Sequence, residues 1–139
     1  GDHRDLHLSI RRQRQMCIRD STWGAMVHVA LDAAENMSNR GIEVEVVDLR
    51  TLVPFDSETC IGSVLRTGRL IVLQESQWTG GFGHTVSSRI IEESFWRLET
   101  PPVVIGALDT PVPFSPTLED HTIPSVEVVS RHIERACTK

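Results

Sequence analysis

Apolar residues recur along this chain with two different periods, and these periods predict four helices and three strands. Helical spacing of the apolar residues extends through residues 25–41, 56–68, 86–98 and 125–137. Short runs that alternate or are continuously apolar, as in strands, cover residues 42–52, 69–75 and 101–107. Helices and strands in this order are typical of an α/β fold, a three-layer α/β/α domain with a mainly parallel sheet.

Each predicted helix has an apolar stripe and recognisable ends. The stripes are Met26, Val29, Ala30, Ala33 and Met37; Cys60, Ile61, Val64 and Leu65; Val86, Ile90, Ile91, Phe95 and Leu98; and Val126, Val129, Ile133 and Ala136. Asp56 or Ser57 is suited to cap the second helix and Ser125 the fourth. Gly41 and Gly68 are placed to end the first and second helices, where a left-handed residue is common.

The predicted strands differ in how deeply they are expected to be buried. The first alternates apolar residues with Glu43 and Glu45 and becomes wholly apolar around Val47, which indicates one better buried end. The second, RLIVLQE, is suited to burial on both faces. After the third, a connection of about sixteen residues carries four prolines, and because ordered connections of that length are uncommon we expect it to lie against something and not to extend freely into solvent.

The first 21 residues differ from the rest in pattern and charge. They lack an apolar period and hold five arginines and three aspartates, whereas the remainder holds nine basic and sixteen acidic residues. RRQRQMCIRDS, residues 11–21, also resembles the translation of a transposase adapter used in DNA sequencing libraries. We therefore expect residues 1–21, the first ten included, to be a non-native segment that contributes little to the core, and residues 22–139 to be the domain. A basic arm or a targeting presequence is the competing interpretation.

The net charge narrows the class of binding partner, and the cysteine content indicates the compartment. The acidic body argues against nucleic acid and suits a basic protein partner. No apolar run approaches membrane-spanning length. Cys17, Cys60 and Cys137 are scattered without the spacing of metal ligands, so we interpret them as buried free thiols in a reducing compartment.

A glycine-rich turn, TGGFG, separates a predicted strand from a predicted helix, a position where helix amides often bind phosphate. Its spacing is not G-x-G-x-x-G and no P-loop lysine follows, so we interpret Gly80, Gly81 and Gly83 as a tight turn packed on the sheet. Glu75, at the end of the preceding strand, is either a lone catalytic carboxylate or an acceptor for the amides of the turn, and we favour the acceptor. The spacing of histidines and serines indicates no metal site and no hydrolase triad.

Five blocks of sequence resemble the transketolase C-terminal-type domain. They are TWGAMVHVALDAAE, GIEVEVVDLRTLVPFD, TGRLIVLQES, TGGFGHTVSSRIIEESF and LDTPVPFSPTLEDHTIPSVEVV, in this order. They are most similar to the β subunit of thiamine-dependent 2-oxo acid dehydrogenases for pyruvate or branched-chain 2-oxo acids, and the acetoin dehydrogenase β subunit is also similar. In that family two strands precede the first helix, and the second is central. Both would fall before Thr22, so we expect a domain that lacks its first strands, with QMCIRD as the candidate stand-in.

The resemblance implies the function of a parent protein. This is an α2β2 oxidoreductase that decarboxylates a 2-oxo acid on thiamine diphosphate and acylates a lipoyl arm. In the family the α subunit holds the diphosphate with magnesium, and the N-terminal domain of the β subunit holds the aminopyrimidine. A fragment limited to the C-terminal domain is therefore expected to bind neither cofactor and to be inactive. The implied compartment is the bacterial cytoplasm, or the mitochondrial matrix in a eukaryote.

The resemblance also implies partners for the C-terminal domain, which pairs β subunits and presents a surface to the acyltransferase core. Asp109, Pro111 and Pro113 match the family's proline loop. The peripheral subunit-binding domain of the acyltransferase docks through basic residues in that family. The candidate docking residues here are therefore the acids Glu119, Asp120, Glu127 and Glu134. The alternative interpretation is that these acids are simply exposed to solvent and contact no partner. The alternative function is a free-standing adaptor or ligand-binding module with this fold.

Overall fold

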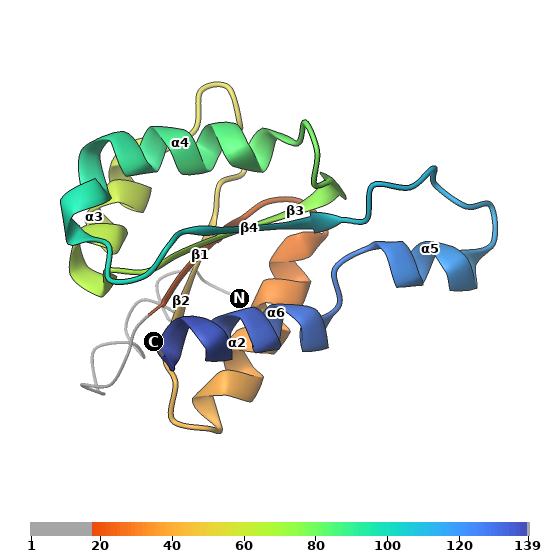
Figure 1. Cartoon of the computed structure of the whole chain (residues 1–139), viewed down its shortest axis with the longest axis horizontal. Coiled ribbons are helices and arrows are strands. Elements are labelled where there is room, and N and C mark those ends of the chain that lie inside the picture. The colour runs from red at the N-terminus through yellow and green to blue at the C-terminus, as the bar shows by residue number, and fades with distance from the viewer. Residues whose placement is uncertain (1–17, 139) are drawn as a thin grey trace.

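Four strands form one sheet with helices on both faces in the computed structural model, which describes residues 18–138 (Figure 1). The strands are β1 (Ile18–Thr22), β2 (Val44–Asp48), β3 (Leu70–Gln77) and β4 (Val103–Ala107). They pair in the order β2-β1-β3-β4, and every pair is parallel. This arrangement confirms the predicted three-layer α/β/α fold.

The predicted caps at Asp56, Gly68 and Ser125 are confirmed, whereas the first helix ends at Ser38 before Gly41 and the third starts and ends four residues earlier than predicted. They are α2 (Met26–Ser38), α3 (Ser57–Thr67), α4 (Phe82–Ser94), the short α5 (Pro116–Thr122) and α6 (Val126–Cys137), with a 3-10 turn η2 (Phe95–Arg97) after α4. The Asp56 carboxylate accepts the Thr59 N–H at the start of α3, and the Ser125 hydroxyl accepts the Val128 N–H at the start of α6. Gly68 ends α3 in the left-handed conformation with φ +70°.

The inner strand β1 is formed by residues that the sequence predicts to stay out of the core. Its backbone pairs with β2 along its whole length and with β3 from Arg19 onward, and the side chains of Asp20 and Ser21 are fully buried. The prediction that residues 1–21 contribute little to the core is therefore wrong for Asp20 and Ser21, whereas the candidate stand-in QMCIRD does supply Ile18–Asp20 of the inner strand. The non-native origin of the segment stays a prediction, and residues 1–17 lie outside the described part. The apolar pattern alone did not indicate this strand, because inner parallel strands are normally apolar on both faces.

Two apolar clusters lie on opposite faces of the sheet. The first joins α2 and α6 to the sheet, and the second joins α3 and α4 to it. Alternate residues of β3 supply both clusters, since Ile71 and Leu73 face α2 and α6 whereas Leu70 and Val72 face α3 and α4. The predicted burial of β3 on both faces is confirmed.

Three side chains lie differently from their predicted positions. Leu65 is 38% exposed and Phe95 is 56% exposed, because α3 buries Ser63 instead and α4 ends before Phe95. Glu45 was expected opposite the apolar face of its strand but is only 4% exposed, since α3 covers that face. There its carboxylate accepts the Ser63 hydroxyl and lies 3.4 Å from Arg66 Nη2, so polar partners stabilise the buried acid.

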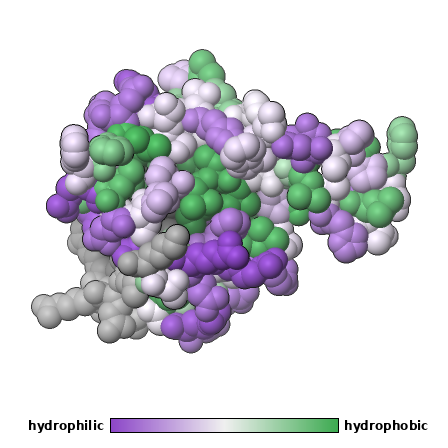
Figure 2. Space-filling model, viewed as in Figure 1, coloured by the Kyte–Doolittle hydropathy of each residue, from purple (hydrophilic) through white to green (hydrophobic). Residues whose placement is uncertain are grey.

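The connection between β4 and α6 projects from the body as an arm, which we define as residues 108–123. It leaves the carboxyl edge of the sheet and carries α5 (Figure 1). Its base is closed by a hydrogen bond from Leu108 N–H to the Thr122 carbonyl (3.0 Å). Apolar residues are spread over the arm (Figure 2), among them Phe114, which is fully exposed, and the expectation that the connection lies against something stays a prediction for its tip.

Cys60 and Cys137 are buried and free, which confirms the prediction for these two thiols. Burial raises the pKa of the Cys137 thiol. Within residues 18–138 no helix has both the length and the apolar character needed to cross a membrane.

Candidate functional site

The carboxyl edge of the sheet brings together the glycine turn and the base of the arm. The turn joins β3 to α4, and the arm leaves β4 beside it (Figure 1). This edge is where ligand sites form in open parallel sheets. Whether this edge can bind a ligand therefore depends on which amides and side chains of the turn and the arm are not already hydrogen-bonded within the domain.

The side chain of Gln74 occupies the space beneath the glycine turn. It is fully buried, its Oε1 accepts the Gly83 N–H (2.6 Å), and its Nε2 donates to the Gln77 carbonyl (2.8 Å). Glu75 was expected to accept amides of the turn, but its side chain is exposed, and the Gly83 N–H is accepted by Gln74 instead. The structure thus assigns the acceptor to Gln74, one residue earlier. Leu70, Val72 and Gln74 share one face of β3, so the strand period itself contains the signal.

The glycines of the turn are explained by how closely they approach this side chain. A Cβ on Gly81 would overlap the Gln74 amide group, and a Cβ on Gly83 would lie 2.5 Å from its Oε1. Gly106 of β4 is equally constrained, because its Cβ would lie 2.9 Å from Gln74 Nε2. Gly80 has open space but a φ of +75°, which favours glycine for its backbone.

The turn does not fit a diphosphate, because its amide and its interior are already used. The Gly83 N–H, at the start of α4, is directed at Gln74, and the space that a phosphate oxygen needs is filled by the same side chain. This geometry supports the interpretation of Gly80, Gly81 and Gly83 as structural residues. Among residues 18–138 no group of three or more His, Cys, Asp or Glu residues is arranged to hold a metal ion.

Trp78 fixes the turn to the edge strand. Its N–H donates to the Ala107 carbonyl (3.0 Å), and its indole Nε1–H donates to the Val104 carbonyl (3.0 Å). The His84 ring packs edge-on against the indole, with centroids 4.6 Å apart, and its Nε2 lies 2.7 Å from the Trp78 carbonyl oxygen. These contacts hold the start of α4 on β4.

A carboxylate clasp fixes the arm to the turn. Asp109 accepts two hydrogen bonds from Thr79, one from its N–H (2.9 Å) and one from its hydroxyl (2.5 Å). The Thr79 hydroxyl, and to a lesser extent the Thr79 amide, hold the pKa of Asp109 below its ordinary value, because both groups donate hydrogen bonds to the charged carboxylate. Gln77 adds a bond from its side-chain amide to the Thr110 carbonyl. Pro111 and Pro113 follow on the arm, Pro111 exposed and Pro113 half-buried.

The four acidic docking candidates fall into two groups. Glu119 and Asp120 are exposed on α5, and Glu119 lines a hollow of about 150 Å³ between the arm and the ends of β3 and β4. Glu75 lines the same hollow, so the structure brings these two carboxylates to one place. Glu127 is exposed in the first turn of α6, whereas Glu134 is bonded to Arg40 (2.5 Å) and is less available to a partner.

Comparison with known proteins identifies the family. The family model described as "Transketolase, C-terminal domain" matches residues 21–129. This chain belongs to the transketolase C-terminal domain family. The recognised resemblance is thereby confirmed, and the transketolase C-terminal domain is the unit whose edge, turn and arm are described above.

Relatives of this transketolase C-terminal domain are β subunits of an acetoin oxidoreductase and of pyruvate dehydrogenases. The chain is 43% identical over 109 residues to the acetoin:2,6-dichlorophenolindophenol oxidoreductase subunit beta of Cupriavidus necator, covering 78% of this chain and 32% of that protein. It is 36% identical over 116 residues to the pyruvate dehydrogenase E1 component subunit beta of Rickettsia felis (84% and 36%). The corresponding subunit of Bacillus subtilis is 47% identical over 94 residues (68% and 29%). The chain thus spans about a third of the length of the curated relatives it matches.

Proposed function

We propose that this chain is the C-terminal domain of the β subunit of a thiamine-dependent 2-oxo acid dehydrogenase. The parent α2β2 enzyme decarboxylates its 2-oxo acid and acylates a lipoyl arm. In this assembly the domain pairs with the second β subunit and docks the peripheral subunit-binding domain of the acyltransferase. The observation that carries the proposal is that relatives include the β subunits of dehydrogenases for two 2-oxo acids, pyruvate and 2-oxoisovalerate, beside the β subunit of an acetoin oxidoreductase.

The surface of the domain supports an assembly role. The arm exposes Leu108, Val112, Phe114 and Leu118, each more than half accessible, although large apolar side chains are usually buried. At its base, Glu75 and Glu119 line one hollow whose walls include the apolar Leu108 and Ile123. A basic side chain of a partner would find carboxylates for its charge and apolar walls for its stem. Apolar anchors beside acids suit a basic protein partner.

Thiamine diphosphate and magnesium are proposed to bind elsewhere in the parent enzyme. The support is the glycine turn, whose interior is filled by Gln74 and is not shaped for a diphosphate. Calorimetry of this chain with thiamine diphosphate and magnesium is expected to show no binding heat. Binding in the micromolar range would contradict this assignment.

The proposed function is tested by domain replacement in the Bacillus subtilis relative. Residues 22–138 replace the matching C-terminal part of that β subunit, and the hybrid is produced with its natural α subunit. We expect an α2β2 particle by light scattering, with decarboxylation of pyruvate and transfer to lipoyl domains. A folded hybrid that stays unpaired would contradict the proposed role. The matched control is the hybrid that also carries Phe114→Ser, which tests whether the arm contributes to assembly.

The genomic sequence upstream of Thr22 tests the origin of the first residues and the alternative function together. We expect an open reading frame that continues into a pyrimidine-binding domain and that does not encode residues 1–21. A start codon near Thr22 would instead identify a free-standing adaptor module. A frame that encodes residues 1–21 would show that the segment is native.

A further inference from the structure

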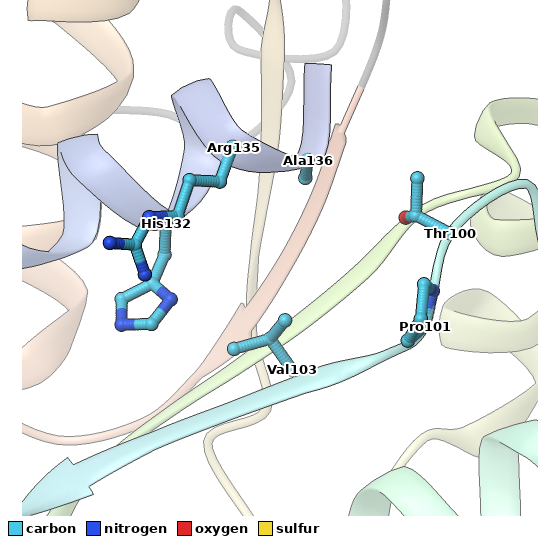
Figure 3. A pocket seen from close by; sticks show the side chains of 6 residues that line it. All are labelled: Thr100, Pro101, Val103, His132, Arg135 and Ala136. Carbon is cyan, nitrogen blue, oxygen red and sulfur yellow. The ribbon is translucent and has the colours of Figure 1, made fainter. Parts of the chain in front are cut away.

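A second hollow lies on the opposite side of the fold from the glycine turn, between α6 and the start of β4. Its volume is about 260 Å³, and its lining is formed by Thr100, Pro101, Val103, His132, Arg135 and Ala136. Figure 3 shows His132 and Arg135 reaching side by side from α6 toward β4, with Thr100 and Pro101 on the opposite wall and Val103 between them. The hollow therefore has an apolar floor and one wall of nitrogen donors.

The donors come from one face of α6. His132 and Arg135 are three residues apart, the spacing at which helical side chains are neighbours. No acidic side chain in residues 18–138 pairs with the Arg135 guanidinium, whereas the adjacent Glu134 is bonded to Arg40. Arg131 adds a further positive charge one turn away but does not line the hollow. The wall is thus cationic and lacks an acid of its own.

The negative groups nearest the hollow are already neutralised. The carbonyl of Ala136, at the end of α6, accepts a hydrogen bond from Arg69 Nε (3.0 Å). Glu99, which precedes Thr100, forms an ion pair with the same arginine (2.8 Å). Arg69 therefore offsets the negative end of the helix and the carboxylate of Glu99, and an anion in the hollow would not meet either group unpaired.

We propose that the hollow between α6 and β4 binds a carboxylate that carries a short apolar tail. The guanidinium of Arg135 would hold the carboxylate in a charge-assisted hydrogen bond, His132 would donate a second bond from its ring, and the tail would lie on Pro101, Val103 and Ala136. A bare inorganic anion gains nothing from the apolar floor, and a neutral molecule loses the charge-assisted part of its bond to Arg135. This inference is independent of the proposed subunit function, because it rests on a different face of the domain.

The ionisation of His132 supports the same chemistry. Burial lowers the pKa of His132, and the charges of Arg135 and then Arg131 lower it further. The imidazole is thus neutral near neutral pH and still has one N–H to donate. A bound carboxylate brings a negative charge beside the ring, and so we expect the pKa of His132 to rise when the site is occupied.

The test uses the full chain and sodium butyrate as the probe, followed by NMR. We expect saturable shifts at Val103 and His132 with a dissociation constant of about 1–10 mM, the range for so small a ligand. We also expect an increase in the pKa of His132. Butyramide, which has the same shape without charge, and inorganic phosphate, which lacks the tail, are expected to bind at least about tenfold more weakly.

Two matched variants distinguish specific binding of butyrate in the hollow from a general attraction of the anion to the positive charges of α6. Arg135→Met is expected to weaken butyrate binding at least about tenfold, because a charged hydrogen-bond donor is lost. Arg131→Met removes the same charge from the same helix outside the hollow and is expected to change binding less than about twofold. Equal effects of the two variants, or equal binding of butyrate and butyramide, would overturn the proposal. Thermal melts of both variants verify that they fold.

The carboxylate has two possible sources, a free small acid or an acidic side chain of a polypeptide. A second titration uses the capped peptide N-acetyl-Val-Val-Glu-amide, whose glutamate brings the same group. Tighter binding of the peptide assigns the hollow to a protein partner, and tighter binding of butyrate assigns it to a small acid. Failure of both probes to shift Val103 would overturn the proposal.

Discussion

At the scale of single residues, the Gln74 side chain determines the shape of the glycine turn. It is buried under α4, accepts the Gly83 N–H, and leaves no room for a Cβ on Gly81, Gly83 or Gly106. The turn therefore has the composition of an anion site but is filled by a side chain from its own strand. A glycine-rich turn before a helix binds phosphate only when its amides point into free space.

Loss of Gln74 should destabilise the domain strongly. Gln74→Ala leaves the Gly83 N–H without its acceptor and opens a cavity, so we expect the free energy of unfolding to fall by about 2–4 kcal/mol. The matched control is Glu75→Ala, at an exposed side chain, with an expected change within about 0.5 kcal/mol. Urea denaturation measures both. A larger effect at Glu75 than at Gln74 would restore the original interpretation that Glu75 supports the turn.

At the scale of elements, the clasp between Asp109 and Thr79 should control the mobility of the arm. Asp109→Ala removes both acceptors, so we expect faster hydrogen exchange of the Thr79 amide and of residues 108–122, with little change in exchange of the sheet. Asp120→Ala, at an exposed acid of α5, is the control and should leave exchange unchanged. Equal exchange in both variants would show that the clasp does not order the arm.

The clasp should also depend on pH with a defined sign. Because the folded pKa of Asp109 is lowered, its contribution is fully present above the unfolded Asp value of about 3.9 and is lost as the pH falls through the folded value. The amide proton shift of Thr79 should therefore titrate with a midpoint below that value. A midpoint at or above it would contradict the bonds from Thr79.

The inner strand β1 should be essential for folding although its residues are polar. Removal of residues 1–21 takes away the strand that pairs with both β2 and β3, so we expect loss of cooperative thermal unfolding. The control is removal of residues 1–17, which retains β1. The difference between the two melting curves isolates the contribution of residues 18–21. Identical melting temperatures would show that the rest of the sheet is stable without this strand.

These elements show which part of the fold is predictable from sequence. Apolar periods locate α2, α3, α4 and α6, because each helix buries a stripe on the sheet. The apolar period does not locate β1, which is mostly polar and pairs through its backbone with β2 and β3; only the family resemblance made QMCIRD a candidate for this position. The apolar period does not indicate the burial of Glu45 either, since its partners Ser63 and Arg66 come from a helix distant in sequence. The acceptor beneath the turn was misplaced by one residue, although the alternation along β3 indicates it.

At the scale of the whole molecule, acidic groups on the arm should steer a basic partner. We expect Glu119→Lys with Asp120→Lys in the hybrid α2β2 enzyme to lower the association rate of the peripheral subunit-binding domain about three- to tenfold at low salt. The salt dependence of that rate should become weaker, as measured by surface plasmon resonance. Glu58→Lys with Glu93→Lys, at exposed acids of α3 and α4, makes the same change in net charge outside the arm and is the control. An unchanged rate and salt slope would identify the acids of α5 as a solvated face.

The closed base of the arm has a consequence for how its length can vary. The chain leaves and re-enters the body across one hydrogen bond, from Leu108 N–H to the Thr122 carbonyl, so its two ends are already together in space. The entropy of closing such a loop grows only with the logarithm of its length, about 0.6 kcal/mol for each doubling. We therefore expect insertions and deletions at the tip of the arm to change the free energy of unfolding of the sheet by less than about 1 kcal/mol.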